Sequence, residues 1–252
     1  MWIDVVDLRD FYASALGQGA RRMIRRKLRM LWPDVKGMRV LGIGYAAPYL
    51  GMFQGEAERV ICAMPAGQGV LRWPAEGDAQ AVLVDELELP FPDLSMDRVV
   101  LVHALECAEQ VKPLTREIWR VLTDSGRAVI IVPNRSGLWA RFERTPFGHG
   151  RPYSPRQLSN LLRDGMFTPI TTERALYMPP FRRAMLVRSM QAWERGGALF
   201  LGSFAGVIVM EAVKQIYGCV PAAQARRRHY MPLPTGGAPA AGRGGLRRRL
   251  PP

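Results

Sequence analysis

The sequence feature that most constrains the fold is an apolar run from Arg39 to Ile43 that ends in a turn of small residues and then enters a new segment. The glycines of this turn are Gly42 and Gly44. A strand that leads through such a turn into a helix can hold a nucleotide-like ligand, because glycine lets backbone N–H groups approach closely. Gly-x-Gly turns also serve tight strand–helix connections without a ligand. The turn therefore predicts a strand–helix unit and leaves the ligand open.

The segments after the turn alternate between strand-like and helix-like patterns. Short apolar runs are expected to form strands at Arg39–Ile43, Val60–Met64, Ala81–Val84, Arg98–Val102, Arg127–Val132, Phe167–Ala175 and Gly206–Ala212. Helical patterns are found at Val5–Leu31, Tyr49–Phe53, Leu114–Leu122, Pro155–Asp164 and Pro180–Glu194. This order predicts an α/β protein with a Rossmann-like, doubly wound and mostly parallel sheet.

The length of 252 residues is enough for one substantial core. We expect a helical extension over residues 1–35 and a single α/β domain over residues 36–218. Proline, glycine, alanine and arginine dominate from Pro221 onward, so a disordered tail is expected over residues 219–252.

The net charge of +13 is unevenly distributed along the chain. Seven arginines follow Glu211, the last acidic residue, and a second basic cluster lies between Arg21 and Arg29. The tail predicts weak, nonspecific attraction to anions and no specific nucleic-acid partner. The early cluster is best interpreted as the solvated face of a helix, whose arginine stems cover apolar surface.

The three cysteines, Cys62, Cys107 and Cys219, lack the spacing of a metal site or a disulfide framework, and no metal is expected. The first residues do not form a basic region followed by an apolar core, so no secretory signal is predicted. The apolar stretch from Ala198 to Met210 is too short to span a bilayer. These features together predict a cytoplasmic protein.

Three segments in the right order resemble the class I S-adenosylmethionine-dependent methyltransferases. The first is the glycine turn itself. The second, Asp85–Val100, resembles the family's acidic and Leu-Pro-Phe segment that leads into the fourth strand. The third, Glu117–Arg127, resembles the helix end before the fifth strand. The resemblance extends from about Arg39 to Gln215. It implies a seven-stranded sheet with an antiparallel last strand, S-adenosylmethionine as cofactor, and methyl transfer to a small molecule.

The resemblance also assigns candidate cofactor-binding residues. The turn would hold the amino-acid end of the cofactor, the end of the second strand its ribose, and the end of the third strand its adenine. The candidates are Gly42, Gly44, Tyr45, Met64, Asp85, Glu86, Leu87 and His103. The sequence departs from the family at four of the family's positions. Gly42 and either Ala63 or Met64 stand where an acid is usual, and Ala46 and Pro48 stand where glycine is usual.

Candidates for catalysis lie after the fourth and fifth strands. His103 directly follows the fourth strand and could contact the cofactor or act as a general base, with Glu106 as its partner. Histidines at strand ends also occur without such a role. Tyr153 closes a Gly-His-Gly-Arg-Pro-Tyr segment that could serve as a lid over substrate or as an ordinary connection. Tyr12 could reach the cofactor pocket, but a Phe-Tyr pair on an apolar helix face is more often part of a core.

Three function classes remain open from the sequence. The first is a small-molecule methyltransferase. The second is a methyltransferase-like protein that has lost turnover and binds or regulates, which the residues at Gly42, Ala46, Pro48 and Met64 favour. A pocket filled by Tyr45, Tyr49 or Met64 would support this second class. The third, a nucleic-acid methyltransferase, is suggested only by charge, since Pro133-Asn134 does not provide the usual catalytic motif.

Overall fold

The computed structural model describes residues 2–180 and 204–216. Most of the helix predicted from Pro180 and the tail predicted over residues 219–252 lie outside the described residues. The strands are β1 (Arg39–Gly44), β2 (Arg59–Pro65), β3 (Ala81–Val84), β4 (Met96–Val102), β5 (Leu122–Pro133), β6 (Phe167–Ala175) and β7 (Val207–Lys214). The helices are α1 (Val5–Ala13), α2 (Ala15–Leu31), α3 (Ala47–Leu50), α4 (Val111–Val121) and α5 (Pro155–Asp164).

The seven strands form one sheet in the order β3-β2-β1-β4-β5-β7-β6. The first five are mutually parallel, and β7 runs antiparallel to both β5 and β6. The predicted fold class is therefore confirmed, including the antiparallel last strand. Because β1, β2 and β4 are parallel, their carboxyl ends meet at one edge of the sheet, where open α/β sheets bind ligands.

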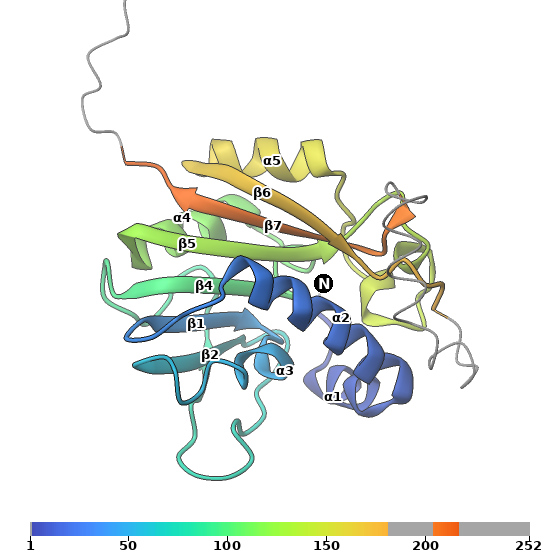
Figure 1. Cartoon of the computed structure of the whole chain (residues 1–252), viewed down its shortest axis with the longest axis horizontal. Helices are drawn as coiled ribbons and strands as arrows, with labels where there is room; N and C mark the ends of the chain where they lie inside the picture. The colour runs from blue at the N-terminus through green and yellow to red at the C-terminus, as the bar shows by residue number, and fades with distance from the viewer. Residues whose placement is uncertain (1, 181–203, 217–252) are drawn as a thin grey trace, which may run out of the picture. The chain divides into compact units, whose positions relative to one another are not determined.

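Helices cover both faces of the sheet (Figure 1). Val40 and Val100 point to the face that packs against α1, α2 and α3. Leu41 and Val99, one residue away, point to the opposite face with α4 and α5. This alternation follows from the two-residue period of a strand, and it explains why the central strands are apolar throughout.

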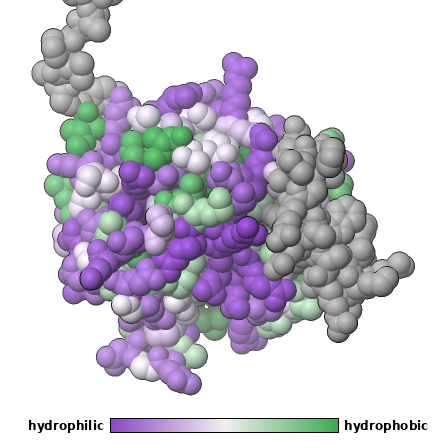
Figure 2. Space-filling view, in the orientation of Figure 1, coloured by the Kyte–Doolittle hydropathy of each residue, from purple (hydrophilic) through white to green (hydrophobic). Residues whose placement is uncertain are grey.

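The amino-terminal helix predicted over Val5–Leu31 is interrupted at Ser14. Ser14 is extended, and its hydroxyl accepts a hydrogen bond from Gly17 N and caps α2. The capping serine therefore divides the expected helix into α1 and α2. On the basic face of α2, Arg22 and Arg26 are exposed and the other basic residues are partly buried. The space-filling view shows a mainly hydrophilic surface over this helix (Figure 2).

Three other expectations differ from the structure. β5 begins at Leu122, because pairing with Met96 of β4 keeps residues 122–126 extended where a helix stop was predicted. The helix expected at Tyr49–Phe53 is the single turn α3. The segment expected to be a loop from Leu138 contains two 3-10 turns, Trp139–Arg141 and Pro146–Gly148, anchored by buried aromatic side chains.

None of the helices in the described part of the chain is both long and apolar enough to cross a lipid bilayer.

A buried carboxylate on β7 links α2 to the sheet. Glu211 Oε1 accepts hydrogen bonds from Trp32 Nε1 at 2.9 Å and from Arg127 Nη1 at 3.2 Å. Both Glu211 and Trp32 are buried. The carboxylate therefore has an ionic partner at the sheet and a neutral partner at the end of α2.

We expect Glu211→Ala to lower the free energy of unfolding by about 2–3 kcal/mol, because it leaves the buried Trp32 N–H unsatisfied. Glu173→Ala is the matched control, since the ion pair of Glu173 with Lys27 is partly exposed and is worth at most about 1 kcal/mol. Urea unfolding monitored by circular dichroism measures both values. Equal losses in the two variants would contradict this role of Glu211.

Candidate functional site

The predicted turn lies at the carboxyl end of β1, beside the end of β4. Tyr45 N donates a hydrogen bond to Val102 O at 2.9 Å, so this N–H of the turn is already used by the protein. Gly44 has a φ of +81°, and a Cβ there would collide with Val102 O and lie 2.9 Å from Ala104 Cβ. Gly44 is therefore required by the close approach of two strands, whether or not a ligand binds.

Gly42 is required by the packing of α3 against β1. A Cβ at Gly42 would lie 2.5 Å from Ala46 Cβ and 2.6 Å from Leu50 Cδ1. The site therefore has no room for the acid that the family usually carries at this position. The two departures at Gly42 and Ala46 compensate for each other, since the methyl group of Ala46 fills the space that a side chain at residue 42 would need.

Three tyrosines and a histidine fill the space beyond the turn. The Tyr12 hydroxyl lies 2.8 Å from the Tyr49 hydroxyl and 2.9 Å from His103 Nε2. The rings of Tyr12 and Tyr45 stack with their centroids 5.7 Å apart. Tyr12 is thus part of the core, as the more common interpretation predicted, and it also reaches the predicted site.

Burial raises the pKa of each of these three phenols. The pKa of Tyr45 rises to about 12. The pKa values of Tyr12 and Tyr49 rise as well, with burial as the largest cause. The three phenols therefore stay neutral at physiological pH.

The amino-terminal segment covers the loop that follows β2. The ring of Trp2 lies where a Cβ of Gly67 would project, and Val5 occupies the same place at Gly69. Val5 N also donates a hydrogen bond to Gln68 O at 2.9 Å. These two glycines form a cradle that the protein fills with its own side chains.

Several buried polar atoms beneath this cover lack hydrogen-bond partners among the described residues. They are Gln68 Oε1, His103 Nδ1 and both carboxylate oxygens of Glu106. His103 Nδ1 lies 3.4 Å from Glu106 Oε1, an ion-pair distance. Gln68 Nε2 donates to His103 O at 3.2 Å, which places the three residues together. Leaving buried polar groups unsatisfied is costly, so this cluster is suited to binding a polar ligand.

His103 also has a strained backbone, with a φ of +51°. Such conformations are uncommon outside glycine and tend to occur at functional sites. The side chain is fully buried between Tyr12 and Phe147, whose ring centroid lies 4.8 Å from that of His103. His103 and Glu106 are thus brought together as predicted.

The other sequence candidates lie around this cluster. Met64 is buried at the end of β2, and its Sδ accepts a hydrogen bond from Leu71 N at 3.4 Å. Asp85 is exposed after β3, where its Oδ1 caps a turn through Leu87 N at 2.8 Å. Glu86 beside it is partly exposed. Tyr153 is half-buried, and its pKa is raised by burial and by the charge of Glu106.

A cavity of about 870 Å³ lies between α1 and the segment at residues 142–150. Its wall includes Trp2 and Phe11 on one side and Phe142, Thr145 and Gly150 on the other. The amino-terminal helix and the predicted lid segment thus frame a cavity next to the covered sheet edge.

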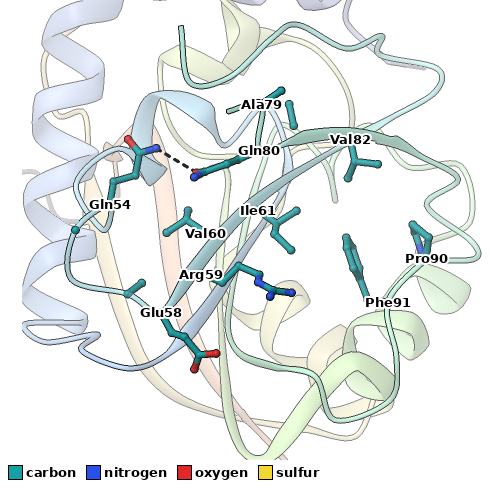
Figure 3. A pocket seen from close by; sticks show the side chains of 13 residues that line it. Gln54, Glu58, Arg59, Val60, Ile61, Ala79, Gln80, Val82, Pro90 and Phe91 are labelled. Carbon is teal, nitrogen blue, oxygen red and sulfur yellow. Dashed lines mark hydrogen bonds between the residues drawn. The ribbon is translucent and has the colours of Figure 1, made fainter. Parts of the chain in front are cut away.

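A second cavity, of about 730 Å³, lies at the amino-terminal ends of β2 and β3 (Figure 3). Val60, Ile61 and Phe91 form its apolar wall, and Gln54 Nε2 donates to Gln80 Oε1 at 3.2 Å near its border. This cavity lies away from the carboxyl ends of the strands and contains none of the predicted site residues.

The sequence analysis missed Trp2 and Gln68. No local pattern marks either residue, because their role arises from the position of the amino-terminal segment over the loop after β2. The Gly-Gln-Gly segment at residues 67–69 indicates a connection after the second strand. It does not indicate which side chains pack over the two glycines.

Comparisons with known proteins show what the domain is similar to. Residues 41–130 match the sequence model of a family described as methyltransferase domain. A demethylmenaquinone methyltransferase of Deinococcus radiodurans is 31% identical over 120 residues, which are 47% of this chain and 49% of that protein. The chain therefore spans about half the length of the curated relative it matches.

Solved structures show the same fold. A methyltransferase from Thermotoga maritima, titled as a possible histamine N-methyltransferase, aligns with a TM-score of 0.59 and 14% identity, covering 84% of this chain and 96% of that one. A 1,6-didemethyltoxoflavin-N1-methyltransferase from Burkholderia thailandensis, with S-adenosylhomocysteine bound, aligns with a TM-score of 0.52 and 17% identity, covering 83% of each chain.

These comparisons confirm the predicted resemblance to the class I methyltransferases, the family whose cofactor is S-adenosylmethionine. The sequence match extends from β1 into β5 and thus includes the glycine turn, β4 and Glu106. The cluster of unpartnered polar atoms fits a polar cofactor at the carboxyl edge, provided that the amino-terminal segment leaves the Gly67–Gly69 cradle.

We expect Gly42→Ala to lower the free energy of unfolding by about 1–3 kcal/mol, because the added methyl group overpacks the contact with Ala46. The double variant Gly42→Ala/Ala46→Gly removes one of the two opposing groups and is expected to regain part of this loss, since Leu50 Cδ1 still faces the new methyl group. Urea unfolding of both variants provides the measurement. An additive loss in the double variant would show that the two positions do not compensate.

Stability is expected to fall as the pH rises above about 10, the pKa of a tyrosine in an unfolded chain. The unfolded state then releases phenolic protons, whereas burial keeps Tyr12, Tyr45 and Tyr49 protonated in the folded state. Thermal unfolding between pH 9 and 11.5 should show a shallower decline for Tyr45→Phe than for the wild type. Identical slopes would show that Tyr45 ionises normally in the folded protein.

Proposed function

We propose that this chain transfers a methyl group from S-adenosylmethionine to a small molecule. The observation that supports this most strongly is the group of unpartnered polar atoms of Gln68, His103 and Glu106 at the carboxyl edge of the sheet. The family match over residues 41–130 supplies the chemical class. No feature of the described residues identifies the acceptor by name.

The residues suited to hold the cofactor are those at the ends of β2 and β4. Gln68 offers a free amide oxygen after β2, His103 follows β4, and Gly67 and Gly69 allow close approach. When bound, S-adenosylmethionine supplies an electrophilic methyl group on sulfur. The exposed Asp85 and its neighbours after β3 stay candidates for the adenine end.

The chain's own residues would bring the two reactants together and exclude water. Alignment of reactants is itself a large source of rate enhancement. The buried His103–Glu106 pair provides a proton acceptor near the cavity between α1 and residues 142–150, with Tyr12 holding His103 Nε2 in place. Tyr153 lies near the same carboxylate, since the charge of Glu106 acts on its phenol.

A second candidate function is a binding or regulatory protein without turnover. One observation favours it: the turn is packed by Tyr45 and Tyr49, and Met64 is buried at the ribose position. A protein of this kind would keep the sheet and the tyrosine cluster while the cofactor site stayed closed.

Calorimetric titration of S-adenosylmethionine and S-adenosylhomocysteine into the full chain distinguishes the two functions. We expect micromolar binding that Gln68→Ala weakens at least tenfold, since this variant removes an amide from the cluster. Trp2→Ala should tighten binding, because the indole ring covers the Gly67 cradle. Asp164→Asn, an exposed carboxylate at the end of α5, serves as the control and should bind like the wild type.

The absence of heat and of thermal stabilisation at millimolar cofactor, in both the wild type and Trp2→Ala, would overturn the methyltransferase proposal. The chain would then be assigned to the second candidate function.

A further inference from the structure

The cavity between α1 and residues 142–150 has aromatic walls and an acidic rim. Trp2, Phe11 and Phe142 provide the aromatic surface. The charged residues that line it are Asp4, Asp7, Asp10, Glu143, Arg144 and His149. Four carboxylates thus face one arginine and one histidine, so the rim carries an excess of negative charge.

Part of this negative charge is compensated locally. Asp10 forms an exposed ion pair with Arg9 at 2.9 Å, and Asp4 Oδ1 accepts a hydrogen bond from Val6 N at 2.7 Å. Asp7 and Glu143 are both exposed, one on α1 and the other on the facing segment. A cation that enters between them is attracted from two sides.

Glu106 lies behind Gly150 in the wall of this cavity, with its backbone carbonyl and Cγ nearest to that wall. A Cβ at Gly150, which lines the cavity, would lie 3.2 Å from Glu106 Cγ. Glu106 is 2% exposed, and neither of its oxygens accepts a hydrogen bond from a described residue. Its ion-pair neighbour is His103 Nδ1, 3.4 Å from Glu106 Oε1. A buried carboxylate whose oxygens accept no hydrogen bond is costly unless a cation or several donors satisfy it.

We propose that this cavity binds a small protonated amine, which the acidic rim attracts and the Glu106 carboxylate satisfies. The inference rests on the proposed function, in which this amine is the methyl acceptor. The bound ammonium first gives one proton to the Glu106 carboxylate. The neutral nitrogen then forms its bond to the methyl carbon as the sulfur–methyl bond of the cofactor breaks, and S-adenosylhomocysteine leaves. An ammonium group carries a positive charge and up to three N–H donors, which match the unpartnered acceptors. The aromatic walls favour a cation further through the negative faces of their rings.

Trp2 connects this cavity to the proposed cofactor site. Its side chain lines the cavity and also fills the cradle at Gly67. The two sites are therefore neighbours with one indole ring shared between them. An amine in the cavity would lie next to a cofactor at the sheet edge.

Three probes of similar shape and different charge test the proposal: 2-phenylethylamine, 2-phenylethanol and 3-phenylpropionate. Their binding to the full chain is measured by calorimetry and by ligand-observed NMR at pH 7, without cofactor. We expect the amine to bind at least tenfold more tightly than the alcohol, and the carboxylate to bind most weakly. Added salt should weaken amine binding, because the rim carboxylates are exposed.

Two variants locate the binding. Glu106→Gln keeps the shape of the side chain, removes its charge, and should weaken amine binding about tenfold with little effect on the alcohol. Asp7→Asn/Glu143→Gln changes only exposed residues and should weaken amine binding severalfold while the protein stays folded. Asp164→Asn is the control with the same type of charge change away from the cavity.

Equal affinities for the three probes, preference for the carboxylate, or no binding of the amine at millimolar concentration would each overturn the proposal. So would amine binding that both the Glu106 and the rim variants leave unchanged. Because these measurements contain no cofactor, their failure is independent of whether S-adenosylmethionine binds. Cofactor binding without amine binding would leave the methyltransferase proposal intact and remove the amine as acceptor.

Discussion

The hydrogen bonds of the Tyr12 hydroxyl hold the amino-terminal helix against the carboxyl ends of the sheet. One reaches Tyr49 on α3 and the other reaches His103 after β4. These contacts set the position of α1, and with it the place of Trp2 and Val5 over the loop after β2. The cover of the proposed cofactor site and one wall of the cavity both depend on this position.

The divergent glycine turn is consistent with the packing around it. Gly42 lacks the family's acid because Ala46 and Leu50 occupy the space, and Gly44 is fixed by the approach of β4. The packing of the protein therefore requires glycine at both positions, whether or not a ligand binds. If the chain binds S-adenosylmethionine, the polar contacts come mainly from the ends of β2 and β4.

The two buried glutamates illustrate the difference between a structural and a candidate functional carboxylate. Glu211 is satisfied by Trp32 and Arg127 and links α2 to the sheet. Glu106 has a histidine at ion-pair distance and no hydrogen bond to its oxygens from the described residues. A buried carboxylate whose oxygens accept no hydrogen bond lowers the stability of the fold. Such costly groups are typical of sites that bind ligands.

The sequence by itself determined the succession of strands along the chain and the fold class, because these depend on local periodicity, and short motifs such as the turn at Gly44 carried the resemblance to the class I methyltransferases. It also placed His103 and Glu106 together, since three residues separate them. Only the tertiary structure decided that Trp2 fills the cradle at Gly67 and that Gln68 joins the polar cluster. Trp2 is distant in sequence from Gly67, and Gln68 is 35 residues from His103, so no local pattern encodes either contact.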